Sequence, residues 1–243
     1  MLEIDAIILT NILQKEKDAM VSALTKDGLL SFYARGVKDN KSKNAAAVNI
    51  GVLAKLELNE GRQGGLHLKS GTLIKNLSAR LNNLLDYVSF NYAIELAMKG
   101  SEAIEDKEKA YEDLLNLLEA DDKASFIVHL LIYIAHNINL LGAKMKVDGC
   151  IKCGDKHHIV TYSLDDGGLI CDKHFDNFLF KKYEKDEINL FRFVFMAKQD
   201  DAYRVDLDLS YYLNLLDQFT RFLNDSVGIN IKSFSLFKPF YKN

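Results

Sequence analysis

Residues 150–174 read CIKCGDKHHIVTYSLDDGGLICDKH and hold all three cysteines of the 243-residue chain. Cys150 and Cys153 form one pair with a two-residue gap, and Cys171 and His174 form a second pair with the same gap. A gap of this length lets a tight turn direct both side chains at one ion. Two such turns supply the ligands of a tetrahedral metal site.

The ligand types indicate which metal the site takes. Thiolates and an imidazole without a carboxylate suit zinc, and a full set of protein ligands leaves no open position for an activated water. We therefore predict a structural Zn²⁺ site. The predicted ligands are Cys150, Cys153, Cys171 and His174. His157 and His158 are expected in an exposed loop but stay open as alternatives for the fourth ligand.

A disulfide framework is the competing interpretation of these cysteines. The cysteine count is odd, and the start of the chain, Met-Leu-Glu-Ile-Asp, lacks the basic and apolar regions of a signal peptide. No apolar run reaches the length that a bilayer crossing needs. We therefore expect a cytoplasmic protein with reduced cysteines and no membrane partner.

Charge is distributed unevenly along the chain, although the net charge is only -3. Residues 1–80 carry 12 Lys and Arg against 8 Asp and Glu, a net of +4, and the remaining residues carry 19 against 26, a net of -7. The amino-terminal part is therefore the better candidate for contact with phosphates.

An alternation of apolar and polar residues, typical of β-strands, runs through the first 75 residues. The predicted strands cover residues 4–9, 19–25, 28–35, 50–58 and 66–75. Asp27-Gly28 predicts a hairpin turn, because this dipeptide tolerates the positive backbone angles of such turns. Residues 60–65 offer a second turn. So few short strands predict a small closed barrel rather than a sandwich.

The most basic stretch lies between the third and fourth predicted strands, where residues 34–43 read ARGVKDNKSK. A solvated loop is the simplest interpretation, but loops at the rim of a small barrel are where such folds bind single strands. Phe32 and Tyr33 face opposite sides of a strand, so one belongs to the core and the other can stack on a base. The predicted DNA-binding residues are Tyr33, Arg35, Lys38, Lys41 and Lys43.

The pattern changes to a helical period after Asn76. One helix is predicted from Leu77 to Gly100, and the acidic residues 101–122 predict another with a solvated charged face. Residues 123–141 are apolar on almost every side, which predicts the central helix of a bundle. His129 and His136, on that helix, are expected to be packed and hydrogen-bonded.

Two further segments complete the helical part. Residues 210–225 predict an amphipathic helix, and the tail from residue 228 is expected to dock over the core. We therefore predict an α+β chain whose domains cover residues 1–76 and 77–243, the second with a zinc-binding insertion at residues 147–176.

Signatures of catalysis are missing from the sequence. No phosphate-binding glycine loop of the Walker type, no Gly-x-Ser-x-Gly elbow and no zinc-deaminase signature is present. We therefore predict that the protein is not an enzyme. A zinc hydrolase stays an alternative only if the metal has an open position.

Three groups of motifs together resemble the family of the bacterial recombination mediator RecO. The first comprises Asp5-Ala-Ile-Ile-Leu-Thr10 and residues 25–36 with the basic run to Lys43. The second comprises the Cys150/Cys153 pair with Gly154, then Tyr162-Ser163, Gly167-Gly168 and Cys171, and the third is Gly228-x-x-x-Lys232-Ser233. The zinc-bearing members of that family usually end the metal site with a second Cys-x-x-Cys, where this chain has His174.

The resemblance implies an OB-fold amino-terminal domain, a helical second domain and a nucleoid-associated role in recombinational repair. It also implies partners: single- and double-stranded DNA, RecR, the tail of single-stranded DNA-binding protein and, indirectly, RecA. Such a mediator anneals complementary strands without hydrolysing nucleotides. The alternative function is a protein-interaction adaptor with the same OB-fold and structural zinc that does not bind DNA.

Overall fold

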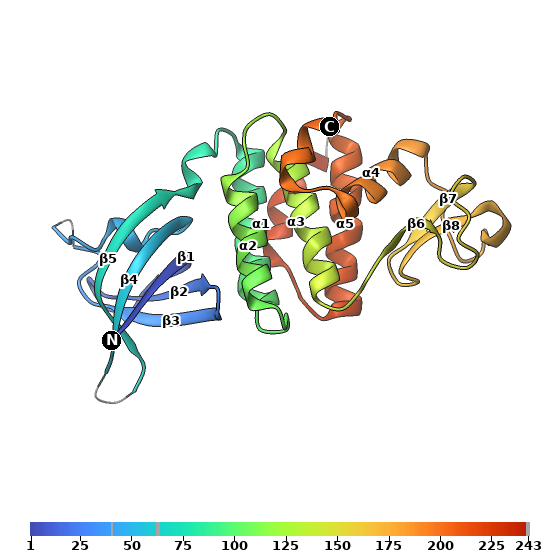
Figure 1. The fold of residues 1–243 in the computed structure, drawn as a ribbon. Coiled ribbons are helices and arrows are strands. Elements are labelled where there is room, and N and C mark those ends of the chain that lie inside the picture. Colours follow the sequence, from blue (N-terminus) through green and yellow to red (C-terminus); the bar gives the residue numbers. More distant parts are fainter. Residues whose placement is uncertain (40, 62–63, 242–243) are drawn as a thin grey trace. The chain divides into compact units, whose positions relative to one another are not determined.

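The structure is a computed structural model that describes residues 1–39, 41–61 and 64–241, with only the backbone at residues 79–80. It contains two compact units, which we describe separately. The first comprises residues 1–82 and 94–119, and the second comprises residues 83–93 and 120–243. A strand-rich part is followed along the chain by a helical part (Figure 1), so the predicted α+β class is confirmed.

The strands of the first unit form a closed barrel in the order β1-β2-β3-β5-β4 (Figure 1). All neighbouring strands are antiparallel except β3 and β5, which pair in parallel where Phe32 lies opposite Leu66 and Tyr33 opposite His67. This is an OB-like barrel, as expected. The strands are β1 (Leu2–Leu13), β2 (Ala19–Thr25), β3 (Gly28–Ala34), β4 (Val52–Glu60) and β5 (Leu66–Asn76).

The barrel encloses the alternate apolar residues of its strands, as the sequence pattern predicts. Ile8, Val21, Phe32 and Leu56 belong to this core. The predicted hairpin turn joins β2 to β3, and Gly28 there has a φ of 113°, which favours glycine. The second predicted turn is closed by a hydrogen bond of 2.9 Å from the Gly61 N–H to the Gly65 carbonyl, while its Arg62 and Gln63 lie outside the described residues.

The acidic helix α2 (Lys107–Glu119) packs against β2 and β3 in the same unit. Its apolar residues are buried as predicted. Its charged face is exposed to solvent as predicted, and two of its carboxylates also form ion pairs with the barrel: Glu108 pairs with Lys26 at 2.8 Å and Glu119 pairs with Lys75 at 2.9 Å. These ion pairs give two cations of the barrel a carboxylate partner.

The helix predicted from Leu77 begins instead at Leu84, as α1 (Leu84–Gly100), and it ends at Gly100 as predicted. Residues 77–80 form a short 3₁₀ turn, η2. Two asparagines explain the break, because each accepts a hydrogen bond at the start of a helix. The Asn76 side chain accepts from the Ser78 N–H at 3.2 Å, and the Asn83 side chain accepts from the Asp86 N–H at 2.9 Å.

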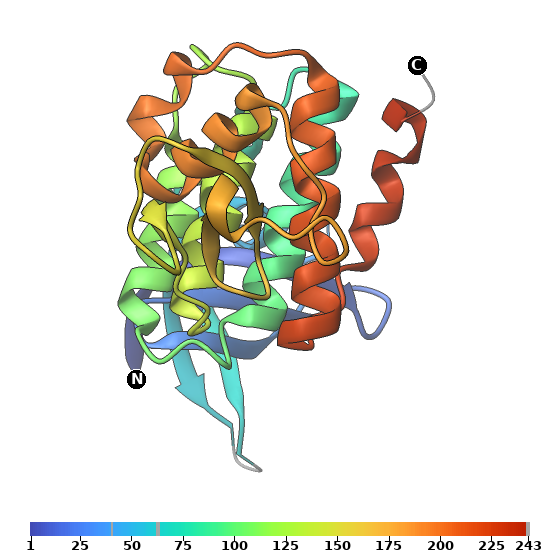
Figure 2. The ribbon, with the colours of Figure 1, turned by 90° about the vertical axis from the view of Figure 1, so that its right-hand side faces the viewer.

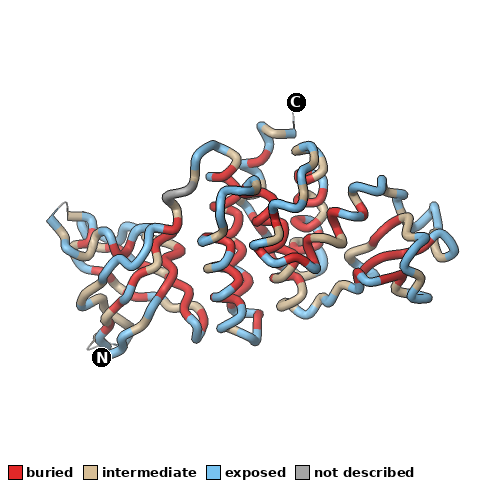
Figure 3. Tube along the Cα trace, turned by 45° about the horizontal axis from the view of Figure 1, so that its top comes forward, coloured by how far each residue is buried: buried red, intermediate tan, exposed pale blue. Residues whose placement is uncertain are grey.

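The second unit is built around α3 (Phe126–Leu140), which is buried along most of its length (Figure 3). This confirms the predicted central helix. It contacts α4 (Lys185–Met196) and α5 (Leu209–Phe222). Both histidines of α3 are packed and hydrogen-bonded, as expected: His129 Nδ1 lies 2.9 Å from Gln199 Oε1, and His136 Nε2 lies 3.0 Å from the Ala197 carbonyl oxygen.

The carboxy-terminal tail docks on this unit, as expected. Its 3₁₀ segment η6 (Lys232–Tyr241) contacts α5, and the two lie side by side in Figure 2. Phe237 is completely buried, and its ring meets Tyr92 edge to face with centroids 6.3 Å apart. None of the helices in the described ranges combines the length and the apolar character that a membrane crossing needs.

Tyr92, in the middle of α1, is linked to α5 through a buried hydrogen bond. Its hydroxyl lies 2.9 Å from Thr220 Oγ1, and because Thr220 donates to the Leu216 carbonyl at 2.7 Å, Tyr92 is the donor. We expect Tyr92→Phe to lower the free energy of unfolding by about 1 kcal/mol, the usual contribution of such a bond. Tyr87→Phe is the matched control, because Tyr87 lies on the same helix and is 53% exposed. Equal denaturant midpoints for the two variants would contradict this role.

Candidate metal centre and nucleic-acid interface

A small three-stranded sheet, between α3 and α4 in the chain, carries the predicted metal ligands. Its order is β6-β8-β7, a sheet that the sequence analysis did not predict. The strands are β6 (Lys146–Cys150), β7 (Ile159–Ser163) and β8 (Gly168–Cys171). Gly168 allows β6 and β8 to pair, because a Cβ there would lie 2.2 Å from the Lys146 carbonyl oxygen.

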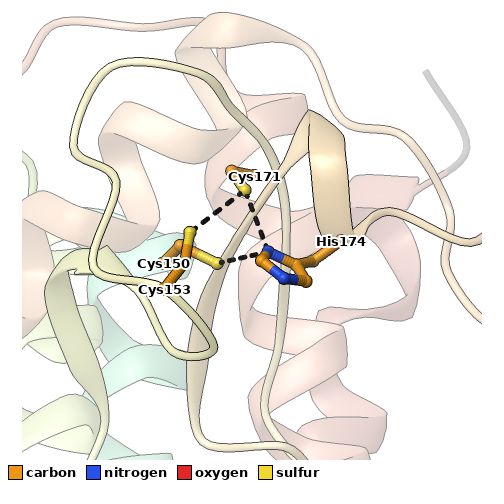
Figure 4. Close-up of side chains that lie close together, drawn as sticks. All are labelled: Cys150, Cys153, Cys171 and His174. Carbon is orange, nitrogen blue, oxygen red and sulfur yellow. Dashed lines mark hydrogen bonds between the residues drawn. The ribbon is translucent and has the colours of Figure 1, made fainter.

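Two turns at the ends of these strands bring the four side chains together. The first follows β6, where the Gly154 N–H donates to the Cys150 carbonyl at 2.8 Å and Gly154 has a φ of 77°. The second is the 3₁₀ turn η3 (Asp172–His174) directly after Cys171. The four side chains point toward one another (Figure 4), and one potential ligand atom from each lies within 4.8 Å of all the others.

Three of the distances between these atoms are close to the edges of a zinc tetrahedron. Bonds of about 2.3 Å to sulfur and about 2.0 Å to nitrogen place ligand atoms roughly 3.5–3.8 Å apart. The Sγ atoms of Cys153 and Cys171 are 3.6 Å apart, and His174 Nδ1 lies 3.7 Å from Cys150 Sγ and 3.3 Å from Cys171 Sγ. All three cysteines are free, and these sulfurs are much farther apart than the about 2.0 Å of a disulfide. The group can therefore hold a metal ion.

The surroundings of Cys150 favour its ligand form. Burial raises the pKa of this thiol, but the backbone N–H groups of Cys171, Cys153 and Lys152 outweigh that effect and lower the pKa to about 6. The thiolate is the form of cysteine that binds a metal, and a lowered pKa makes the thiolate more abundant at neutral pH.

The alternative fourth ligands lie away from this group. His157 and His158 are exposed, and His158 Nδ1 lies 3.0 Å from a carboxylate oxygen of Asp155. His174 therefore completes the group in the structure, and the two loop histidines do not join it.

A groove of about 570 Å³ lies on the barrel beside the predicted DNA-binding residues. Tyr33 and Arg35 line it, together with the β1–β2 loop, Gly64 and Gly65, and the start of β5. Lys15, on the β1–β2 loop, adds a second cation. His67 lies edge-on to Tyr33 with ring centroids 5.6 Å apart, because parallel pairing of β3 with β5 places these two residues opposite each other.

Tyr33 is held in place rather than free. Phe32 is buried in the core, as one of the two aromatic residues was expected to be, whereas Tyr33 is half-buried. The Tyr33 hydroxyl donates to Asp18, and the other carboxylate oxygen of Asp18 accepts from the Gly36 N–H at 2.7 Å. These two hydrogen bonds lower the pKa of Asp18, the Tyr33 bond being the larger cause.

The predicted lysines lie in the segment after Arg35, outside the groove lining. Lys38, Lys41 and Lys43 are exposed, and Asn40 between them lies outside the described residues. The Lys38 N–H donates to the Lys17 carbonyl at 2.9 Å, which places this segment beside the β1–β2 loop. Val37, Ala47 and Val48 of the same connection are buried in the barrel core. The segment is therefore anchored at both ends.

Charges on the barrel are sorted into two sets. Lys26, Lys55, Lys69 and Lys75 each lie within 3.1 Å of a carboxylate. Within the part of the chain that the structure describes, no ion pair involves any of a second set of cations. That set is Lys15, Arg35, Lys38, Lys41 and Lys43. The groove and the adjoining segment therefore present the positive charge of the barrel that its own carboxylates do not neutralise.

Sequence reasoning missed three residues of this region. Lys15 and Asp18 lie in and next to the β1–β2 turn, and Asp18 follows directly on the short basic run Lys15-Glu16-Lys17, which is the one signal that points to them. Nothing in the sequence pattern places His67 next to Tyr33, because strand pairing alone brings them together.

Comparison with known proteins identifies the family. A model described as "Recombination protein O N terminal" matches residues 1–77, and one described as "Recombination protein O C terminal" matches residues 81–234. The second model alone covers more than half of the chain. The two matches follow one another in order and together span the barrel, the helical part and the metal-ligand group.

Relatives with the same description include three bacterial proteins named "DNA repair protein RecO". The one from Caldanaerobacter subterraneus is 28% identical over 173 residues, which is 70% of each chain. The Listeria innocua protein is 23% identical across 94% of this chain and 91% of its own, and the Latilactobacillus sakei protein is 26% identical across 90% and 82%. The chain therefore belongs to the RecO family of DNA repair and recombination proteins.

Proposed function

We propose that this protein is a non-catalytic mediator that binds single- and double-stranded DNA and anneals complementary strands. Its role in DNA repair and recombination follows from family membership. The observation that carries the finer proposal is the set of unpaired cations around the barrel groove, next to the Tyr33 and His67 rings. Residues 1–76 are the DNA-binding domain in this proposal, and residues 77–243 are the helical domain with the insertion at 147–176.

Electrostatic capture of the backbone explains how such a site anneals strands. Lysine and arginine side chains neutralise phosphates and release counterions, which gives affinity without reading the bases. The base edges of the bound strand stay available for pairing. Two captured strands can then find their register without nucleotide hydrolysis, which agrees with the absence of a Walker loop from the sequence.

We further propose that the Cys150, Cys153, Cys171 and His174 group binds a structural Zn²⁺ ion. These residues would hold the ion between the turn after β6, the end of β8 and η3, and four protein ligands would leave no open position for a reaction. The insertion is held against the helices by side-chain packing, because Tyr162 of β7 stacks on Phe191 of α4 with ring centroids 4.0 Å apart.

The family resemblance supports the partners that we propose. They are RecR, the acidic tail of single-stranded DNA-binding protein and, through them, RecA, which the mediator helps to load. A cytoplasmic, nucleoid-associated location accompanies these partners.

Strand annealing tests the proposal directly. We expect the protein to accelerate pairing of two complementary oligonucleotides, one of them coated with single-stranded DNA-binding protein, and to do so without nucleotide. Binding of a labelled oligonucleotide is expected to weaken steeply with salt, by a slope of roughly -0.7 per phosphate contact on a single strand. If the protein captures RecR but no oligonucleotide at low salt, the adaptor function replaces the mediator function.

Asp18 provides a test in which electrostatics and positioning predict opposite results. Asp18→Ala removes a negative charge beside the groove, which by charge alone strengthens DNA binding, but it also frees the Tyr33 hydroxyl and the Gly36 N–H. We expect positioning to dominate, with about fivefold weaker binding of single-stranded DNA, equivalent to about 1 kcal/mol.

Asp18→Asn is the comparison, because the amide removes the charge yet keeps one acceptor oxygen. We expect this variant to bind DNA at least as tightly as the original protein in fluorescence anisotropy. Tighter binding by Asp18→Ala than by the original protein would show that Asp18 does not position the site.

A further inference from the structure

A second cationic cavity lies within the helical unit, between the insertion and α4. It has a volume of about 360 Å³. One wall is a single face of α4, where Lys185, Ile188 and Arg192 recur at helical spacing, and the other is formed by Lys156, the start of β7 and Lys182. Three separate stretches of the chain thus direct a cation to one cavity.

The cavity lining is unusual in its charge. Lys156, Lys182, Lys185 and Arg192 line it, and no carboxylate does. Within the described ranges none of these four cations forms an ion pair. Arg192 Nε donates to the Val147 carbonyl at 3.0 Å, which fixes its guanidinium at the cavity wall. Four cations gathered without a counter-charge favour an anionic ligand.

Two carboxylates at the start of α4 make hydrogen bonds outside the cavity. Glu187 accepts from the Glu184 N–H at 2.9 Å in a cap at the start of α4, and Glu184 accepts from the Tyr211 hydroxyl at 2.9 Å. These hydrogen bonds orient both carboxylates, and neither forms an ion pair with the cavity cations within the described residues.

The edge of β7 argues against an acidic peptide as that ligand. An extended peptide commonly binds by adding a strand to an exposed sheet edge. Here residues 181–183 already cover the edge, because the Tyr183 N–H donates to the Val160 carbonyl at 3.2 Å and Thr161 Oγ1 donates to the Lys181 carbonyl at 2.6 Å. Phosphates need only cations spaced along their path, which the cavity provides.

Two aromatic side chains, His157 and Tyr183, line the cavity, and the Tyr183 ring is not presented for stacking on a base. Tyr183 stacks on Tyr162 with ring centroids 4.3 Å apart and an interplanar angle of 6°, and Lys181 Nζ lies 4.9 Å from the Tyr183 centroid. The four cations can therefore hold a strand here by its backbone, which leaves its base edges available. Annealing requires this property of a second strand.

We propose, building on the function proposed above, that this cavity binds the phosphate backbone of a second nucleic-acid strand. The barrel groove holds one strand, and Lys156, Lys182, Lys185 and Arg192 hold the other. One chain then contacts two strands at once.

A bridging assay tests this assignment. A biotinylated oligothymidylate is fixed on beads, and a fluorescent oligothymidylate is added with the protein; the two strands cannot pair, so only the protein links them. We expect the variant K156Q/K182Q/K185Q to retain at least about tenfold less fluorescent strand than the original protein. The salt slope of this retention is expected to fall by about 2, because three phosphate contacts of roughly 0.7 each are lost. The barrel cations dominate binding of a single strand in solution, so we expect the affinity of this variant for one strand to stay within about threefold of that of the original protein.

The matched control is K144Q/K198Q/K238Q, which removes the same charge from three exposed lysines of the same unit. We expect it to bridge strands like the original protein. Equal bridging by both triple variants would overturn the second site, and so would a labelled oligoaspartate that binds the cavity in preference to DNA. The function proposed above has its own test. If single-strand binding is unchanged when the barrel cations are removed, that function is contradicted, whatever the result of the bridging assay.

Discussion

Replacing His174 by alanine is expected to abolish binding of the proposed Zn²⁺ ion and to destabilise the insertion strongly. Structural zinc sites contribute about 10–16 kcal/mol of binding free energy, so the loss of one ligand of four is expected to cost about 3 kcal/mol or more. For a chain of this size that lowers the melting temperature by about 6–12 °C. Elemental analysis and thermal unfolding measure the two effects. Chelation of the original protein is expected to lower its melting temperature in the same direction.

His158→Ala is the matched control for the metal site. His158 is an imidazole in the same insertion, and its side chain is 64% exposed and pairs only with Asp155 among the contacts described. Because exposed pairs contribute little, we expect a change below about 1 kcal/mol and an unchanged metal content. If His158→Ala loses the metal and His174→Ala keeps it, the fourth ligand is misassigned. A chelator without effect on melting would exclude a structural metal.

Removing four predicted DNA-binding cations together is expected to have the largest effect on nucleic-acid binding. The variant R35Q/K38Q/K41Q/K43Q removes charges that are free of ion pairs within the described structure. Each lost phosphate contact reduces the salt slope by roughly 0.7, so the full variant is expected to lose about 2.8. Taking 1 M salt as the reference, this corresponds to an affinity loss of about 600-fold at about 0.1 M salt, measurable by fluorescence anisotropy with an oligothymidylate.

The control for this variant is K26Q/K55Q/K69Q/K75Q, which removes the same number of charges from the same barrel. Each of these lysines already has a carboxylate partner. Their contribution to the potential at the groove is therefore offset, and we expect less than about a threefold loss of affinity. Equal losses in the two quadruple variants would mean that net charge, rather than the groove, governs binding.

Local patterns predicted most of the elements correctly. The barrel strands follow from alternation, and β2 has the predicted bounds because Thr25 and Gly28 flank a turn whose geometry is local. The predicted start of the helix at 77–100 was wrong, because apolar periodicity does not reveal where a helix is capped. The Asn83 side chain accepts a hydrogen bond from the Asp86 N–H, and α1 begins there. The short strands of the insertion were missed, since four or five residues carry too little pattern to predict a strand.

The two candidate sites differ in how far local sequence could predict them. Metal-ligand spacing names all four members of the cluster, because each pair is held by one tight turn. The cationic groove depends on residues distant in the chain. Pairing of β2 with β3 brings the β1–β2 loop with Lys15 to Arg35, and His67 joins them only when β3 pairs with β5. The cavity beside α4 likewise gathers Lys156, Lys182 and Arg192 from separate segments.

The amino-acid sequence by itself determined the alternation that builds the barrel, the apolar central helix and the four side chains that gather as candidate metal ligands. These are properties of neighbouring residues, so short-range geometry is sufficient to express them. Only the tertiary structure decided which cations keep a free charge and which aromatic rings lie beside them. That depends on which carboxylates and strands approach from elsewhere in the chain, as Glu108 and Glu119 do when α2 packs against the barrel.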